Sequence, residues 1–445
     1  MLRTGTGPTR GPGVRIKHPS ELQGRLLGLA RWSAPGLRMT GFPVRCRATV
    51  PRLPLRRICG APEASGLATY TGLMAIGVDA SRAFEEAPTG IGVYSTEICS
   101  GLIADPPAPL VLYLNRATPP VSAPPLSVES VWRPIPLPRG WTRLRLGWEI
   151  RRRPPELLFI PAYRLPPGRL PRAVVTIHGV EHRMAPQAYP GRAGDRVDSF
   201  VRDTLARAAA VIAPSETTKA DLVHLYGADP GQITVIPHGV AEYFRPDPGG
   251  STPGSPAEVE GRYLLAVGAH HPRKNIPFLV RCFARAFASA PDPPRLVVTN
   301  ALGEVAQALD RQAREAGVRL KLLAHVRGEE LASLYRGALA ACVPSLYEGF
   351  GLPALEAMAC GTPVVAGATG AVQEVAAGAA LLVAPTSEEE WAQALVRLAG
   401  DIELRAHLRS LGLARARGFT WERSVRQHRA LLARELELGR TIQRK

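Results

Sequence analysis

Short apolar runs alternate with longer amphipathic stretches along most of this chain. Runs of three to five residues, typical of β-strands, fall at 75–79, 110–114, 173–177, 210–213 and 234–236, and a second set falls at 263–267, 295–299, 320–323, 339–343, 363–366 and 380–383. The stretches between the runs are long enough for helices. Strands that alternate with helices predict parallel sheets covered on both faces, so we expect an α/β fold.

The two sets of strands are separated by a polar stretch at 246–256 that is rich in Pro, Gly and Ser and typical of a linker. We therefore expect an N-terminal Rossmann-like domain at 74–245, a linker at 246–261 and a C-terminal Rossmann-like domain at 262–410. Residues 411–445 predict a helical segment, and the pattern leaves open whether it returns to the first domain. Because ligands of open parallel sheets bind beyond the carboxyl ends of the strands, we expect a cleft between the domains.

Residues 1–73 are rich in Arg, Pro and Gly and show no sustained periodicity. Three interpretations stay open: a disordered basic tail that contacts membrane or RNA, a transit-like segment, or a misassigned start with Met74 as the first residue. We favour the third, because Met74 directly precedes the first predicted strand. This interpretation predicts that a chain without residues 1–73 keeps its activity.

Length, charge and cysteine usage narrow the classes of function. The chain has 445 residues, 45% of them hydrophobic, which suits two domains with large cores. Its net charge of +17 suggests nucleic acid, but residues 1–73 hold 12 Lys and Arg against two acids, which leaves only +7 for the rest. A mildly basic body suits an anionic ligand or an acidic membrane surface. The six Cys are scattered without a C-x-x-C pair, which is typical of a reducing compartment. We therefore expect a cytoplasmic protein, with contact at the inner face of the membrane left open.

One segment, EGFGLPALEAMACGTPVV at 348–365, carries most of the predicted chemistry. It follows an apolar strand and predicts a glycine loop, a helix that starts at Pro353, and a further strand. The free N–H groups and the dipole of a helix start form a site for phosphate, and glycines let the backbone approach a ligand closely. Glu348 lies before the loop and Glu356 is expected in the first helical turn, where both carboxylates can accept hydrogen bonds from sugar hydroxyl groups. The segment therefore predicts a nucleotide-sugar site.

The same segment resembles the signature of the retaining glycosyltransferases of family 4, whose GT-B fold has two Rossmann-like domains facing a cleft. Further stretches resemble the family: DAS at 79–81, TGIGVY at 89–94, VIAPS at 211–215, ITVIPHGV at 233–240, AVGAHHPRKN at 266–275 and FTW at 419–421. The resemblance covers residues 74–435 and implies both the fold and a sugar-transferring activity.

The resemblance also implies roles for the residues that match the family's motifs. Arg273 and Lys274 are expected to hold the diphosphate of the donor, since cations stabilise the charge that builds on the leaving group. Glu356 is expected to bind the ribose and Glu348 to face the donor sugar. The other expected donor-binding residues lie in two loops that contain glycine: Gly90, Gly92, Phe350, Gly351 and Leu352.

His178 follows a predicted strand where the family places a His near the transferred sugar, so we group it with Glu348, Arg273 and Lys274 as catalytic. The next residue is Gly where relatives often carry Asp, and His182 is a possible substitute. Without the family, a lone His at a strand end is as often structural as functional. Three other positions depart from the family's Arg, Ser and Pro, which puts contacts there in doubt: Val93, Gly370 and Gln373.

The implied reaction is transfer of a hexose, with retention at its anomeric carbon, from a nucleotide-diphosphate sugar to a glycan or lipid-linked acceptor in polysaccharide synthesis. The Arg-Lys-Asn form of the loop at 273–275, with His-Pro before it, resembles mannosyltransferases, so mannose and GDP-mannose are the favoured sugar and donor. No Asp-x-Asp motif lies at the predicted site. We therefore expect a reaction that needs neither a metal ion nor a cofactor.

Other activities fit parts of the pattern. A nicotinamide-dependent dehydrogenase also has Rossmann halves, but Gly90-Ile-Gly92 lacks the third glycine of its fingerprint. A GT-B-type sugar-nucleotide epimerase keeps the fold and changes the reaction, and a phosphorylase would need a cofactor lysine for which the sequence shows no context. The charge alone suggests a nucleic-acid binder, although we expect no specific nucleic-acid partner.

Overall fold

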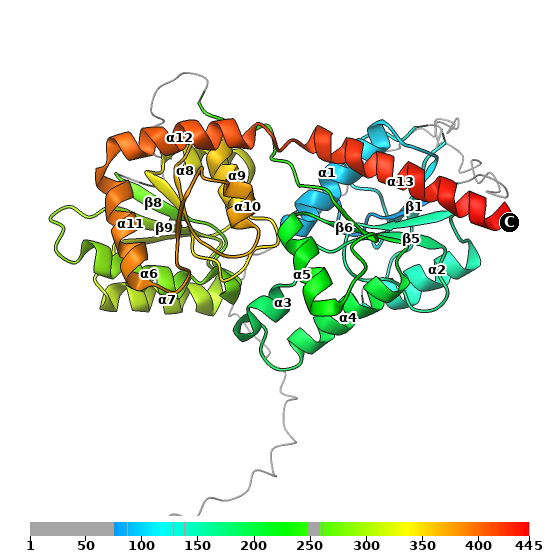
Figure 1. The fold of residues 1–445 in the computed structure, drawn as a ribbon, viewed down its shortest axis with the longest axis horizontal. Helices are drawn as coiled ribbons and strands as arrows, with labels where there is room; N and C mark the ends of the chain where they lie inside the picture. The colour runs from blue at the N-terminus through cyan, green and yellow to red at the C-terminus, as the bar shows by residue number, and fades with distance from the viewer. Residues whose placement is uncertain are drawn as a thin grey trace, which may run out of the picture. The chain divides into compact units, whose positions relative to one another are not determined.

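A computed structural model describes residues 75–86, 88–127, 129–137, 139–247, 259 and 261–444. The interpretations of residues 1–73, and most of the linker predicted at 246–261, fall outside these described residues. Within them the chain forms two parallel sheets, one from each predicted set of strands (Figure 1). The predicted α/β class is therefore confirmed.

The first sheet has seven strands in the order β3-β2-β1-β4-β5-β6-β7, and every neighbouring pair is parallel. This half of the chain contains, in order, β1 (Ile76–Asp79), α1 (Gly90–Ala104), β2 (Leu110–Leu114), β3 (Val131–Pro134), the π-helix η1 (Thr142–Leu146), α2 (Gly147–Arg152), β4 (Leu157–Ile160), β5 (Arg172–Thr176), α3 (Glu181–Met184), η2 (Pro186–Ala188), α4 (Ala193–Arg207), β6 (Ala210–Ala213), α5 (Glu216–Tyr226) and β7 (Ile233–Val235).

The second sheet has six parallel strands in the order β10-β9-β8-β11-β12-β13. Its elements are β8 (Tyr263–Ala266), η3 (Pro272–Lys274), α6 (Ile276–Phe287), β9 (Arg295–Thr299), α7 (Gly303–Glu315), β10 (Leu320–Leu323), α8 (Gly328–Gly337), β11 (Ala340–Val343), α9 (Leu352–Ala359), β12 (Val364–Gly367), α10 (Val372–Ala376) and β13 (Leu381–Val383). The chain ends with α11 (Glu388–Gly400), α12 (Ile402–Ala416) and α13 (Trp421–Arg444).

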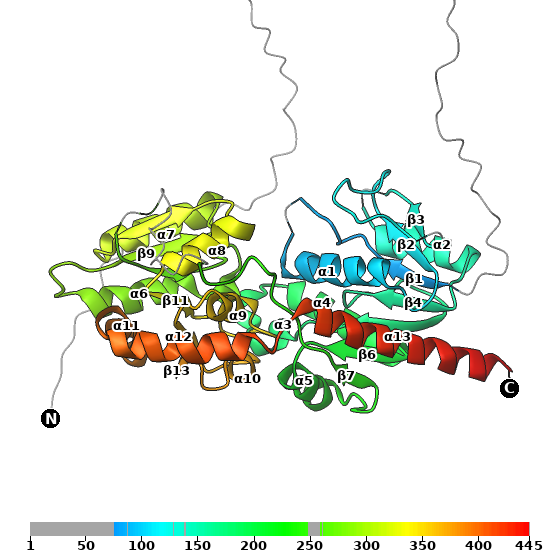
Figure 2. The ribbon, with the colours of Figure 1, turned by 90° about the horizontal axis from the view of Figure 1, so that it is seen from above.

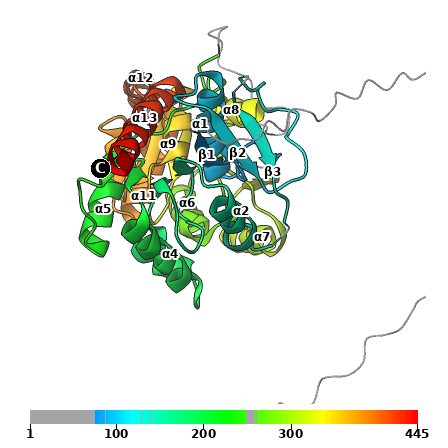
Figure 3. The same ribbon diagram turned by 90° about the vertical axis from the view of Figure 1, so that its right-hand side faces the viewer.

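Alternate side chains of each strand enter two different hydrophobic cores. In β4, Leu157 and Phe159 pack with residues of α1 and α13, whereas Leu158 and Ile160 pack with residues of α2, α4 and α5. Figure 3 shows α1 and α13 on one side of the first sheet and α2 and α4 on the other. Because both faces are covered, the strands appear in the sequence as continuous apolar runs.

Two strands of the first sheet, β3 and β4, were not among the predicted runs. β4 is only four residues long and lies between Pro155 and Pro161, which favour a loop. β3 lies at the edge of the sheet, is half-buried along its length and contains Arg133 and Pro134. An edge strand tolerates such residues, so its sequence carries little strand signal.

The C-terminal helix α13 returns to the first sheet, a point that the sequence left open. Leu431, Leu432 and Leu436 join the core that contains α1, and Figures 1 and 2 show α13 running alongside α1. Glu435 pairs with Arg172 of β5 at 2.5 Å. The first half is therefore built from two distant parts of the chain. Among the described helices, none is long and apolar enough to cross a bilayer.

Candidate functional site

The strand order of the second sheet brings two loops together at its carboxyl edge. β8 and β11 are neighbours, and the chain leaves them towards opposite sides of the sheet, to β9 and to β12. Ligands of open parallel sheets bind at such a point, because the loops diverge there. The two loops are tied directly, since the N–H of Leu346 donates to the carbonyl of Arg273 at 2.8 Å.

Two cations and one carboxylate form a buried cluster where these loops meet. Glu348 accepts hydrogen bonds from Lys274 Nζ at 2.6 Å and from Ser345 Oγ at 2.6 Å, and Arg273 Nη1 lies 2.8 Å from its other oxygen. Glu348 is 5% exposed and Lys274 8%. Burial alone would raise the pKa of Glu348, but Arg273 and Lys274 outweigh it and hold the pKa at about 2. The carboxylate is therefore ionised at neutral pH and binds Arg273 and Lys274, while burial lowers the pKa of Lys274 against the attraction of Glu348.

A short turn positions the two cations. η3 begins at Pro272, and the side chain of His271 caps it by accepting the N–H of Arg273 at Nδ1, 3.2 Å away. Asn275 then adopts a left-handed conformation, with φ of +56°, which ends the turn and starts α6. Asn tolerates this conformation better than most residues, so the sequence His-Pro-Arg-Lys-Asn encodes the turn locally.

The glycine loop after β11 fits closely against the first half of the chain. A Cβ at Gly349 would lie 1.9 Å from the carbonyl oxygen of His178, so only glycine fits. The carbonyl of Gly349 accepts hydrogen bonds from Ser215 Oγ at 2.8 Å and Thr218 Oγ1 at 2.9 Å. The loop thus joins the carboxyl edges of both sheets, with Phe350 buried beside it.

The next two predicted residues start α9. Gly351 has φ of +101°, which glycine adopts without strain, and it caps α9, which begins at Leu352. The sequence placed Glu356 in the first turn of this helix, which is wrong, because Glu356 is its fifth residue. Tyr335 donates a hydrogen bond to Glu356 at 3.1 Å. Burial raises the pKa of Glu356 to about 7, despite the opposing effects of Tyr335 and Lys274.

His178 lies at the carboxyl end of β5, in contact with the glycine loop. Its Nε2 lies 2.9 Å from the carbonyl of Pro161, and because a carbonyl only accepts, Nε2 carries the proton. Its ring packs edge-on against Tyr94, with centroids 4.7 Å apart. Burial lowers the pKa of His178 to about 4, so the ring is neutral at physiological pH.

His182, the possible substitute for His178, is held elsewhere. It is buried, its Nε2 lies 2.9 Å from the hydroxyl of Tyr226, and it lies 3.7 Å from Asp198. These partners belong to α4 and α5. These contacts hold the ring of His182 against α4 and α5, where its Nε2 is already engaged.

Gly90 and Gly92 lie in the first turn of α1, not in a free loop, and only one of them faces the second half. A Cβ at Gly90 would lie 3.7 Å from Leu352 at the start of α9. Gly92 is packed internally, because a Cβ there would lie 2.9 Å from Pro88 and 3.2 Å from Glu85. Thr89 caps the helix by accepting the N–H of Gly92.

The loop after β12 departs from the family's pattern, and the structure gives a physical reason. A Cβ at Gly370 would lie 2.4 Å from the backbone oxygen of Glu348, and the backbone has φ of +53°, so glycine is required. Glu374, further along, accepts the N–H groups of Glu216 and Thr217 at 3.0 Å each. It therefore caps α5 across the two halves, so its carboxylate is already engaged.

Several functional neighbours were missed by sequence reasoning. Ser345 bonds Glu348, Tyr335 bonds Glu356, and His238 packs between the rings of His178 and Phe350 at 5.5 and 4.8 Å. His238 is buried, and its Nδ1 has no hydrogen-bond partner among the residues that the structure describes. Only Ser345 had a usable signal, since it stands three residues before Glu348 in the same loop.

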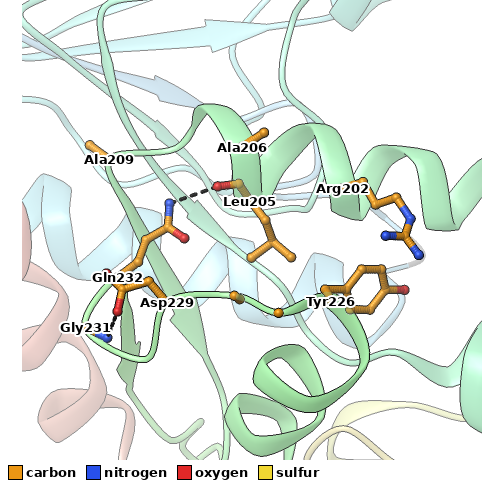
Figure 4. A pocket seen from close by; sticks show the side chains of 10 residues that line it. Arg202, Leu205, Ala206, Ala209, Tyr226, Asp229, Gly231 and Gln232 are labelled. Carbon is orange, nitrogen blue, oxygen red and sulfur yellow. Dashed lines mark hydrogen bonds between the residues drawn. The ribbon is translucent and has the colours of Figure 1, made fainter.

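A surface hollow of about 710 Å³ lies away from this site (Figure 4). It is lined by residues of α4, the end of α5 and the turn before β7, including Leu205, Tyr226 and Gln232. Gln232 lies at the amino end of β7 and donates to the carbonyls of Leu205 and Ala208. Because the expected site is at the carboxyl ends of the strands, we do not assign it to this hollow.

Two family models match the chain. One described as glycosyl transferases group 1 matches residues 261–401, and one described as glycosyltransferase family 4 matches residues 88–242, together about two thirds of the 445 residues. A D-inositol 3-phosphate glycosyltransferase of Actinosynnema mirum is 38% identical over 242 residues, which are 50% of this chain and 56% of that protein. The chain thus spans little more than half of this relative.

Two further similar proteins match this chain over more of their own length. An O-antigen chain mannosyltransferase B of Escherichia coli is 28% identical over 297 residues, 64% of this chain and 75% of that one. Among solved structures, a sucrose-phosphate synthase of Thermosynechococcus elongatus matches with a TM-score of 0.67 at 22% identity, over 82% of this chain and 99% of that one. At 22% identity, the match to the sucrose-phosphate synthase shows a similar fold and nothing further.

Proposed function

The chain belongs to glycosyltransferase family 4 and has the GT-B fold, and from this we propose that it moves a hexose from a nucleotide-diphosphate sugar to a hydroxyl group of an acceptor. The observation that carries the proposal is the buried cluster of Arg273, Lys274 and Glu348 at the carboxyl edge of the second sheet. A buried lysine and a half-buried arginine beside a helix start suit the diphosphate of such a donor.

In the proposed reaction the two cations act on the leaving group. The bond between the anomeric carbon and the diphosphate oxygen breaks, and a bond from the acceptor oxygen forms on the same face of the sugar. The proton of the acceptor hydroxyl passes to the departing diphosphate, so the nucleoside diphosphate is released. Arg273 and Lys274 would bind the charge that develops there, which is the usual route by which a fixed electrostatic environment lowers a barrier. This arrangement supports a reaction without a metal ion.

Glu348 would change partners when the donor binds. Its carboxylate now binds both cations and Ser345. A diphosphate would compete for the cations, which would free an oxygen of Glu348 to accept a sugar hydroxyl. Because the pKa of Glu348 is about 2, the group stays ionised and cannot serve as a general acid at neutral pH.

The remaining predicted residues would make the other contacts to the donor. Glu356, which lies in α9 and interacts with Lys274, would accept the ribose hydroxyls, and the backbone of Phe350, Gly351 and Leu352 would contact the sugar or phosphate. Gly90 would let the start of α1 approach the donor, since no side chain separates it from Leu352. Neutral His178 would accept a hydrogen bond from the transferred sugar at Nδ1. Gly92 has only a packing role in this scheme, because it faces its own loop.

For the donor sugar we favour mannose, carried by GDP, and for the acceptor a glycan or lipid-linked chain in polysaccharide synthesis. The likeness to the O-antigen chain mannosyltransferase B supports this choice. A cytoplasmic location with contact at the inner membrane face belongs to the same proposal. The second candidate acceptor is a phosphorylated inositol, supported by the 38% identity to the D-inositol 3-phosphate glycosyltransferase.

A screen of nucleotide-sugars by thermal unfolding tests the donor, because a ligand that binds only the folded state raises its apparent stability. We expect GDP-mannose to raise the unfolding temperature most, and a larger rise with another nucleotide would change the donor. Tight binding of nicotinamide cofactors in the same screen would overturn the proposal. Stabilising donors are then incubated alone and with each acceptor class. Product with retained anomeric configuration supports transfer, whereas an epimerised donor without acceptor supports epimerisation.

A further inference from the structure

One surface of the first half exposes large apolar side chains among arginines. It is formed by η1 and α2, whose inner residues Leu146 and Ile150 are buried in the core under the first sheet. Leu144 and Trp148 point outward instead and are 65% and 48% exposed. Single exposed apolar residues are common, but here the two are only four residues apart on consecutive helical turns.

The charge of this segment is strongly positive. Residues 139–153 contain six arginines and one acid, Glu149. Glu149 is buried and is held by Arg133, Arg145 and Arg153, so it does not offset the outer charges. The exposed arginines that form no ion pair within the described residues are the following: Arg139, Arg143, Arg151 and Arg152.

The ring of Trp148 lies close to two arginines of this segment, one of which, Arg145, also pairs with Glu149. The guanidinium carbons of Arg145 and Arg152 lie 5.0 and 5.4 Å from the centroid of its ring. Cation–π contacts on the ring hold it in place on the surface without burying it. An outward aromatic side chain with arginines beside it suits the headgroup layer of a lipid bilayer, where Trp lies at the interface and Arg binds phosphate.

A neighbouring loop extends the same charge. A Cβ at Gly168 would lie 3.2 Å from Nη1 of Arg151, so this loop lies against α2. Its next residue, Arg169, is exposed and forms no ion pair within the described part of the chain. The surface therefore combines two outward apolar side chains with five arginines that pair with no acid in the described part of the chain, and we name it the α2 surface: Arg139, Arg143, Leu144, Trp148, Arg151, Arg152 and Arg169.

We propose that the α2 surface binds an anionic lipid bilayer, with Trp148 and Leu144 entering the headgroup layer and the arginines binding lipid phosphate. A purely electrostatic partner such as a nucleic acid would not use Leu144, and a second copy of this chain would have to offer a matching acidic surface. The positive charge and the exposed apolar side chains together favour lipid. This inference deepens the membrane contact of the proposed function and rests on it, but the α2 surface contains none of the residues assigned to donor binding.

The first test measures whether Trp148 enters the lipid. The full chain is mixed with vesicles of phosphatidylglycerol and phosphatidylcholine that carry brominated acyl chains, which quench a tryptophan only at short range. Other described tryptophans are buried or half-buried, so we expect most of the quenching to vanish in Trp148→Phe. Equal quenching in wild type and Trp148→Phe would overturn the proposal.

The second test measures the charge dependence of binding with a matched control. Arg143, Arg151 and Arg152 are replaced by Gln in one variant, and three exposed arginines of α7 and the α12–α13 region, Arg311, Arg417 and Arg426, in the control. We expect the first variant to bind anionic vesicles on the order of 100-fold more weakly, since each cation near an anionic surface contributes separately. The control should bind as wild type does.

The Arg-rich residues 1–73 are present in every variant, so the difference between variants reports only the α2 surface. Equal affinity of both triple variants would overturn the proposal. The proposal would also be overturned if the wild type did not bind vesicles but bound an oligonucleotide tightly, and if Trp148→Phe bound that oligonucleotide equally well. A change from dimer to monomer in light scattering, without a change in vesicle binding, would assign the surface to a second copy. Transfer to a water-soluble acceptor should be unaffected by the triple variant, which separates this result from a failure of the proposed function.

Discussion

Glu348 shares its two carboxylate oxygens among Arg273, Lys274 and Ser345, and all four side chains lie at the meeting point of two loops. Removing one member of a buried ion pair costs about 3–5 kcal/mol, because the other charge is left without a partner. The cluster therefore stabilises the loops and holds the charge that a diphosphate needs. A variant at this site must be tested for folding and for binding separately.

Replacing Lys274 by Ala removes one of the two proposed phosphate ligands. A hydrogen bond to a charged group contributes about 1.5–3 kcal/mol, so the dissociation constant of the donor should rise roughly 10- to 100-fold. Calorimetry with the stabilising nucleotide-sugar measures this, and circular dichroism reports whether the fold is kept. Lys321→Ala, on β10, is the control and should bind normally. Full donor affinity in a folded Lys274→Ala protein would refute the assignment of Lys274.

Glu356 should give donor binding a pH dependence near neutrality. Its pKa of about 7 means that the ionised form, a better acceptor for ribose hydroxyls, grows as pH rises from 6 to 8. Donor affinity should therefore rise up to about tenfold over this range in the wild type, and stay level in Glu356→Gln. The reverse slope, or the same slope in both proteins, would contradict the role of Glu356.

The same group affects stability with the opposite sign. Because its pKa is raised above the usual 4.5, the folded protein keeps a proton that the unfolded chain has already lost. Its contribution to the free energy of unfolding is therefore present below pH 4.5 and is lost as pH rises through 7. Glu348, with its pKa lowered to about 2, contributes stability above pH 4.5 that is lost as pH falls towards 2.

The elements that matter most are the glycine loop and the helix starts around it. The carbonyl of Gly349 is bound by two hydroxyl groups of the first half, and its Cα faces the carbonyl of His178. Glu374 caps α5 from the loop after β12. These contacts fix how the glycine loop packs against the first sheet.

Gly349→Ala should strongly disturb the packing of the glycine loop against the first sheet. A Cβ there would lie 1.9 Å from a backbone oxygen, so the loop must move and the bonds from Ser215 and Thr218 are weakened. We expect a loss of about 1–3 kcal/mol in stability and a large loss of activity. In Gly400→Ala a Cβ meets nothing within 4 Å, so this control should leave stability equal or slightly raised. Urea unfolding and donor binding measure both, and equal behaviour of the two variants would contradict the packing argument.

At the level of elements, the sequence was sufficient wherever local signals agreed. The strand before Gly349, the start of α9 and the turn at Arg273 each have glycine, proline or apolar patterns that act over a few residues. The helix begins at Leu352, one residue before the predicted start at Pro353, because proline is allowed at more than one position of a first turn, and Glu356 therefore falls just beyond that turn. The pairing of Glu348 with Lys274, 74 residues away, depends on the strand order and has no local signal. Similarly, the contacts of His182 with Tyr226 and Asp198 arise only from tertiary packing.

The C-terminal helix α13 packs on the first sheet and completes the first half of the molecule. α13 covers the same face as α1, its Glu435 pairs with Arg172, and its His428 lies 2.7 Å from the hydroxyl of Tyr94. The second half, by contrast, is one continuous stretch of chain. Two halves that each have their own sheet and their own cores commonly unfold in more than one step.

Glu435→Gln should therefore destabilise the first half although the residue lies near the end of the chain. Glu435 is 3% exposed, and its loss leaves Arg172 without its partner, at a cost of roughly 1–3 kcal/mol. Scanning calorimetry should show one transition moved to lower temperature and the other unchanged. The exposed Glu403 of α12 serves as the control, and Glu403→Gln should move neither transition. An equal shift of both transitions would show that the halves unfold together.

The return of α13 also has a consequence for synthesis. Tyr94 and the partner that bonds its hydroxyl, His428, are 334 residues apart, so the first sheet emerges from the ribosome long before its last covering helix. At roughly 5–20 residues per second this interval lasts tens of seconds. During that time the apolar face of β4 and β5 that α13 later covers is open to water. Chaperones would bind such an exposed apolar face in the nascent chain, and the first half gains its full stability only after α13 has been synthesised.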